Sequence, residues 1–343
     1  MEQILKRLRN IRFANPKNTT LLVILLLIIT IMTILMPRSF PSARNITSMA
    51  SQFPEFGFLA LAMMCAMITG GIDLSVVAVA NFTGVLAALI LSGSTMGTMP
   101  TMVLAVVVII IMALVCGALN GSLIAFLGVP PILATLGTQG LFMGLAIVLT
   151  RGHSISGFPV EFLVIGNGYI LGVPISFIMF VVASALIYLV LTKTKQGFSM
   201  FMYGTSSIVS RFSGIDNRKV IIKTYMISAL LAGMSAIIMI SRTNSMRPGY
   251  GAAYLLQAIL VVVLGGVDPD GGFGDVYGVI MAIIILQVTQ SGLNLMAFSP
   301  FFRRFIWGFA LLLVMVLNYL LDKRRVKKQI LEKNRAKAAT PTT

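Results

Sequence analysis

Long apolar runs alternate with short polar segments along almost the whole chain. Most of the runs approach the roughly 20 residues that a helix needs to cross the ~30 Å hydrocarbon core of a bilayer. The pattern predicts ten membrane-spanning helices, at 20–36, 53–69, 75–92, 101–127, 132–150, 173–192, 222–241, 252–268, 275–292 and 303–321. The predicted fold is therefore an all-α polytopic membrane protein.

A basic segment at residues 193–223 interrupts this pattern. It has six Lys and Arg residues against a single acidic residue, Asp216. Its apolar residues fall at helical spacing: Phe198, Phe201, Met202, Ile208, Val209 and Phe212. A short amphipathic helix is expected there, with Ser206 or Ser207 as its N-cap and Gly214 at its end. The segment is either a contact for a soluble partner or a plain basic connector.

The composition supports the membrane prediction. Hydrophobic residues make up 57% of the 343-residue chain and charged residues only 10%, whereas soluble domains carry roughly 25% charged residues. The chain divides into a basic N-terminal segment (1–19), a transmembrane domain (20–321) and a basic tail (322–343). The first apolar run resembles a signal peptide in its order, but it is long and has no clear small-residue cleavage site. We therefore expect it to remain as the first span.

The charge distribution predicts the orientation of the chain. The net charge is +16, and 19 of the 26 Lys and Arg residues lie in the N-terminal segment, in 193–223 and in the tail. Positively charged loops face the cytoplasm. Both termini and the 193–223 segment are therefore expected inside, which requires an even number of spans. Anionic lipid headgroups, rather than nucleic acid, are the expected counter-charge.

The sequence offers little for catalysis. His153 is the only histidine, and Cys65 and Cys116 lie in apolar runs without metal-ligand spacing. The chain has no Gly-x-x-x-x-Gly-Lys-Ser/Thr loop, so it is not expected to bind ATP in that way. We expect no catalytic residue, cofactor or metal, which disfavours a membrane-embedded enzyme.

Polar residues within or near the spans, most of them uncharged, are candidates for a transport pathway. The candidates are Asp73, Ser75, Asn81, Asn120, Thr135 and Gln257. Amides and hydroxyls suit a polar neutral solute such as a sugar, and the charged pairs that would suit proton or sodium coupling are not expected here. Because only Glu55 and Asp73 are acidic near the spans, a secondary transporter or channel that works alone is the weaker alternative.

Two similar glycine signatures lie between spans, Gly70-Gly71-Ile72-Asp73 and Gly265-Gly266-Val267-Asp268. Each is either a tight inner turn or a broken helix beside a pathway. We favour a turn for residues 265–272, where Pro269 cannot continue a helix. Asp73 either caps the next helix or lines the pathway. Small residues at 117–121 are expected to let helices approach closely.

An ordered set of motifs resembles the inner-membrane permeases of ribose-type ABC importers. The motifs are Gly70–Ser75, Gly117–Gly121, Pro130–Thr138, Gly197-Phe198, Gly204, Ser213–Ile215 and Gly265–Gly274. The resemblance covers about residues 52–320 and includes permeases for autoinducer-2, galactofuranose, inositol and nucleosides. It implies a fold akin to the vitamin B12 importer permease, of the type II ABC importer class, in the bacterial plasma (inner) membrane.

The resemblance also implies partners and a coupling site. The partners are cytoplasmic ABC ATPase subunits, a second permease chain that is either a copy or a sister chain, and an extracytoplasmic solute-binding protein. The ATPase-coupling residues would be Gly204, Ser207, Arg211, Phe212 and Gly214. The expected function is import of a polar neutral solute, a monosaccharide first, with a nucleoside or autoinducer-2 as alternatives. Val77, Thr205, Ser210 and the acidic Asp268-Pro269-Asp270 depart from the family pattern.

Overall fold

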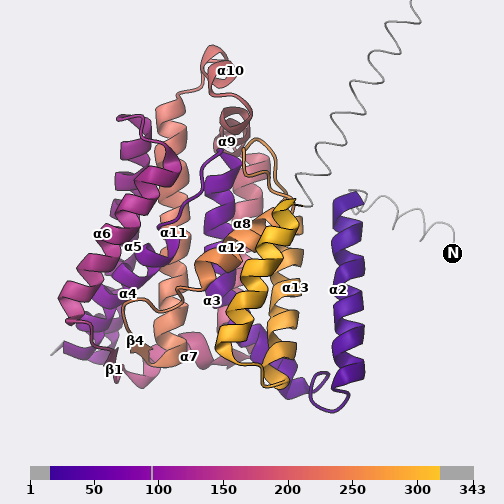
Figure 1. The fold of residues 1–343 in the computed structure, drawn as a ribbon. Coiled ribbons are helices and arrows are strands. Elements are labelled where there is room, and N and C mark those ends of the chain that lie inside the picture. Colours follow the sequence, from indigo (N-terminus) through magenta and orange to yellow (C-terminus); the bar gives the residue numbers. More distant parts are fainter. Residues whose placement is uncertain (1–15, 94–95, 317–343) are drawn as a thin grey trace, which may run out of the picture.

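The computed structural model describes residues 16–93 and 96–316, and these are almost entirely helical (Figure 1). The long helices are α2 (Pro16–Leu35), α3 (Ala43–Ile68), α4 (Val76–Gly93), α5 (Thr98–Ala125), α6 (Pro131–Thr150), α8 (Ile175–Lys193), α11 (Asn217–Thr243) and α13 (Val276–Leu295). Residues 300–316 form a further helix. Eight of the described helices are long and apolar enough to cross a membrane, which confirms the polytopic all-α prediction.

Segments predicted to share a side of the membrane gather at one end of the helical bundle. The short helices α9 (Lys195–Thr205) and α10 (Ser207–Phe212) lie at the end where α2 begins, at the top of Figure 1. At the opposite end lie α7 (Val160–Asn167) and the antiparallel pair β1 (Ile155–Ser156) and β4 (Ser245–Met246). A second pair joins β2 (Tyr169–Ile170) to β3 (Val173–Pro174).

The centre of the bundle is formed by α3 and α11. All residues of α3 from Phe53 to Ile68 are buried, as expected for a helix that is apolar on nearly every side. α11 packs against α3, α4 and α5. A Cβ at Gly117 of α5 would lie 2.5 Å from the Tyr225 carbonyl oxygen, and one at Gly121 would lie 2.6 Å from Ile222 Cα. The small residues of α5 therefore bring two helices together, as expected.

The apolar run at 252–268 does not form the single continuous spanning helix that was predicted, although the chain passes here from the β4 end of the bundle to the end near α9 (Figure 1). It forms α12 (Tyr254–Leu264), which has 11 residues, and at 1.5 Å per residue it is about 16 Å long, too short to cross the bilayer. Turns precede Tyr254, and the helix stops where Gly266 adopts a φ of +87°. Hydropathy did not distinguish these apolar turns from helix.

The turn favoured for residues 265–272 is confirmed. α12 ends at Leu264 and α13 begins at Val276, with Gly271 between them at a φ of +91°. Of the predicted tenth span, residues up to 316 are helical and the rest lies outside the described part of the chain. The tail 322–343 and most of the segment 1–19 also lie outside it. The number of spans therefore stays a prediction.

Candidate coupling site and buried polar clusters

α10 is a six-residue helix with well-defined ends. The Ser206 hydroxyl accepts a hydrogen bond from the Val209 amide at 3.3 Å, so Ser206 is the N-cap. Gly214 follows the helix with a φ of +78°, a conformation that favours glycine. The expected short helix is thus confirmed. The apolar residues that precede it form a separate helix, α9, whose C-cap is also Ser206.

Side-chain hydrogen bonds hold one side of α10 against the start of α11. The buried Ser210 hydroxyl donates to Asn217 Oδ1 at 2.8 Å, and Asn217 Nδ2 donates to the Ser207 carbonyl, also at 2.8 Å. The opposite side is open and apolar, because Phe212 is 89% exposed, Ile208 67% and Val209 52%. Exposed apolar side chains beside charged residues such as Arg211 mark an interaction surface.

A buried polar cluster lies at the turn between α3 and α4. Asp73 is 2% exposed, and its Oδ1 accepts hydrogen bonds from the Ser75 amide at 3.0 Å and the Ser75 hydroxyl at 2.6 Å. Its Oδ2 accepts from the Ser228 hydroxyl of α11 at 3.0 Å. Asn120 Nδ2 of α5 donates to Ser75 Oγ at 2.8 Å. The hydrogen bonds of Asp73 therefore fix the backbone just before α4 and connect this turn to α11. Through Ser75, the turn is also connected to α5.

Thr135 of α6 joins the same turn. Its hydroxyl accepts from the Leu74 amide at 3.1 Å and lies 2.8 Å from the Pro131 carbonyl oxygen. The Asn120 Oδ1 and Tyr225 hydroxyl atoms are buried and have no hydrogen-bond partner among the described residues. Each such atom costs about 1–3 kcal/mol, so the polar groups near this turn are not fully satisfied in this conformation.

The other two predicted pathway residues lie elsewhere. Asn81 exchanges two hydrogen bonds with the backbone of Tyr250, at 2.8 and 3.1 Å, and so fixes the loop after β4 against α4. Gln257 of α12 donates to Gln290 of α13 at 3.5 Å. Four of the six predicted residues thus lie at one turn, and all six are buried within the chain.

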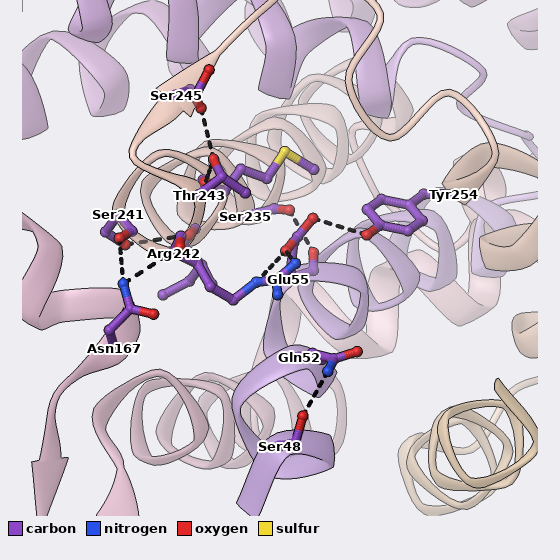
Figure 2. A network of polar contacts seen from close by, with 12 residues as sticks. Ser48, Gln52, Glu55, Asn167, Ser235, Ser241, Arg242, Thr243, Ser245 and Tyr254 are labelled. Carbon is purple, nitrogen blue, oxygen red and sulfur yellow. Dashed lines mark hydrogen bonds and ion pairs between the residues drawn. The ribbon is translucent and has the colours of Figure 1, made fainter. Parts of the chain in front are cut away.

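A buried ion pair was missed at the sequence level. Glu55 of α3 is fully buried and pairs with Arg242 near the end of α11, whose Nε donates to Glu55 Oε2 at 2.7 Å (Figure 2). The Tyr254 hydroxyl donates to Glu55 Oε1 at 2.9 Å. The expectation that charged pairs are absent from the spans is therefore wrong. An acidic residue inside an apolar run was the available signal, because such a residue needs a partner.

This ion pair extends into a network that joins four helices. Asn167 of α7 donates to the Ser241 carbonyl at 2.8 Å, and the Ser235 hydroxyl donates to the Glu55 carbonyl at 2.5 Å (Figure 2). With Tyr254, these contacts connect α3, α7, α11 and α12. Each charge has its partner within the network, so the network offers no free carboxylate for ion coupling.

A family model and two relatives place the chain among known proteins. The family model described as branched-chain amino acid transport system / permease component matches residues 45–315. The Bacillus subtilis (strain 168) ribose import permease protein RbsC is 34% identical over 297 residues, covering 86% of this chain and 90% of that protein.

A second relative is the Yersinia pestis (strain Pestoides F) autoinducer 2 import system permease protein LsrD, 29% identical over 296 residues, covering 84% of this chain and 87% of that protein. No solved structure matches the chain significantly. The family match spans most of the helical bundle, including α9, α10 and the turn at Asp73. The chain therefore belongs to the branched-chain amino acid transport system / permease component family, as a membrane permease of the ribose and autoinducer 2 import type.

Proposed function

We propose that the chain is the transmembrane permease subunit of an ABC importer and that a separate cytoplasmic ATPase drives it through α10. The observation that supports this most strongly is the open apolar side of α10, where Phe212, Ile208 and Val209 are exposed. α10 itself lies at one end of the bundle (Figure 1). A surface of this kind is stabilised by burial against a soluble partner. The neighbouring Arg211 adds a charged contact at its rim.

In this proposal the pathway forms between this chain and a second permease chain. The chain lies in the bacterial inner membrane with both termini cytoplasmic, and an extracytoplasmic binding protein delivers the solute at the end formed by α7, β1 and β4. Closure of the ATPase around nucleotide displaces α10 and shifts the helices between two arrangements. Asp73, Ser75, Asn120 and Thr135 are candidates for the groups that rearrange.

The solute is proposed to be polar and uncharged, with a monosaccharide first. The relative named for ribose import supports a sugar. The relative named for autoinducer 2 import supports autoinducer 2 as the alternative solute. The buried polar side chains of the bundle support an uncharged solute, because most of them are amides and hydroxyls. A stand-alone secondary transporter is disfavoured because Glu55 and Arg242 neutralise each other.

The test is reconstitution of the chain with its partner ATPase and solute-binding protein. The double variant Arg211→Ala/Phe212→Ala should insert normally but lose most uptake and most stimulation of ATP hydrolysis, because it removes the exposed contact. Val23→Ala is the matched control, since Val23 is 57% exposed but lies within α2, outside both the proposed contact and the end at which the binding protein delivers the solute. Wild-type coupling in the double variant, or ATP-independent uptake by the permease alone, would contradict the proposal.

A further inference from the structure

Three glycine-containing segments that are far apart in the sequence meet beside α10. A Cβ added at Gly204, near the end of α9, would overlap the Ile68 carbonyl oxygen of α3 and the Gly272 amide nitrogen. A Cβ at Gly271 would lie 2.5 Å from the Gly70 amide nitrogen and 3.1 Å from Gly204 Cα. We call these residues, Gly70, Gly204, Gly271 and Gly272, the glycine junction.

The junction is a contact between backbones. The Gly272 amide donates a hydrogen bond to the Ile68 carbonyl at 2.9 Å, which joins the turn before α13 to the end of α3. Gly204 packs onto both partners of that bond. Because no side chain separates these backbones, a displacement of one cannot be absorbed by a change of rotamer. Close-packed contacts of this kind transmit movement between elements.

The junction lies between the proposed ATPase contact and the buried polar cluster. On one side, Gly204 is two residues before Ser206, the residue that ends α9 and caps α10. On the other side, Gly70 is three residues before Asp73, whose carboxylate bonds to Ser228 of α11. The same turn reaches α5 through Ser75. A continuous set of contacts therefore runs from α10 to the helices at the centre of the bundle.

We infer that Gly204 is a positioning residue through which movement of α10 reaches the turn at Asp73, and hence α11 and α5. This inference rests on the proposed function, because it presumes that a partner moves α10. It concerns transmission rather than docking, because Gly204 is partly buried and packs against Ile68 and Gly272. The exposed side chains of α10 contact the ATPase, and the glycine junction determines how much of the movement of α10 reaches the other helices.

The test is Gly204→Ala in the reconstituted importer. Gly204 is helical, so alanine suits its backbone and raises its helix propensity; only the close contacts oppose the methyl group. The variant should co-purify with the ATPase at the wild-type ratio, whereas solute imported per ATP hydrolysed should fall about tenfold or more, within the usual range of coupling between linked sites. Gly308→Ala is the matched control, since Gly308 is also helical and has open space around it.

A second measurement covers the case in which Gly204→Ala does not fold. Hydrogen exchange of the wild-type complex should change in segments 66–75 and 268–274 together with 204–213 when nucleotide is added. Wild-type transport per ATP in Gly204→Ala, or a change confined to 204–213, would overturn the inference. If the wild-type importer showed no ATP-driven uptake at all, the proposed function itself would fail, so the two failures are distinguishable.

Discussion

Replacing Arg242 with methionine should strongly destabilise the permease. The Glu55 side chain is fully buried and the Arg242 side chain is 24% exposed, so the substitution leaves a buried carboxylate that keeps the Tyr254 hydroxyl as a donor but has lost its cation. Removing one partner of a buried ion pair costs about 3–5 kcal/mol, because the remaining charge has lost its compensation. At about 2 °C per kcal/mol for a chain of this size, the midpoint of thermal unfolding should fall by roughly 5–10 °C.

The assay uses the two cysteines of the chain. Cys65 and Cys116 are 1% and 2% exposed, so a thiol-reactive dye that fluoresces on labelling reports their exposure as the detergent-solubilised protein unfolds. Adding Glu55→Gln to Arg242→Met should recover most of the lost midpoint, since a neutral amide at residue 55 needs no cation and still accepts from Tyr254. Recovery of the unfolding midpoint would show that the destabilisation comes from the uncompensated charge of Glu55 and not from lost packing of the Arg242 side chain.

The exposed ion pair between Lys219 and Asp216 provides the matched control. Its side chains are 75% and 49% exposed, and exposed pairs contribute little to stability. Lys219→Met should therefore leave the midpoint nearly unchanged. The reasoning would be refuted if Arg242→Met behaved like Lys219→Met, or if the double variant were no more stable than Arg242→Met alone.

Three further predictions concern the end of the bundle near α10. Ser206→Ala removes the cap of α10 and about 1 kcal/mol of helix stability, so a titration should show the ATPase binding several-fold more weakly; unchanged affinity would contradict this. Gly71→Ala places a Cβ 2.6 Å from the buried Tyr225 hydroxyl and should lower stability by about 1–3 kcal/mol, whereas a wild-type unfolding midpoint would count against it. The pKa of Asp216 is lowered by hydrogen bonds from Lys219, so its cap on α11 is lost only as pH falls below about 4. Asp216→Ala should then shift the midpoint equally at pH 5 and pH 7, and an effect that appears only at pH 7 would disprove the assignment.

The sequence predicted elements whose signals are local. Apolar runs identified the long helices because a span must be apolar over its whole length. Ser206 and Gly214 identified α10 because a helix end needs a capping side chain and a residue that adopts positive φ. A continuous helix was predicted for residues 252–268 because the apolar residues in the turns around α12 have the same hydropathy as residues in a helix.

The contacts that connect these elements could not be predicted in this way. Glu55 and Arg242 are 187 positions apart, and the isolated acid shows that a partner is needed without showing which residue it is. Gly70, Gly204 and Gly271 each look like the end or turn of a local element. Their convergence depends on how α3, α9 and the turn before α13 pack, and no local pattern encodes that packing.

The most direct test of the proposed coupling is the accessibility of α10 from each side of the membrane. Val209→Cys places a thiol at a residue that is 52% exposed, while Cys65 and Cys116 are buried and should give little background. A membrane-impermeant maleimide should label Val209→Cys in inverted vesicles but not in intact cells, and the bound ATPase should protect it. Labelling from outside intact cells would contradict the account, and so would labelling in inverted vesicles that the ATPase does not reduce.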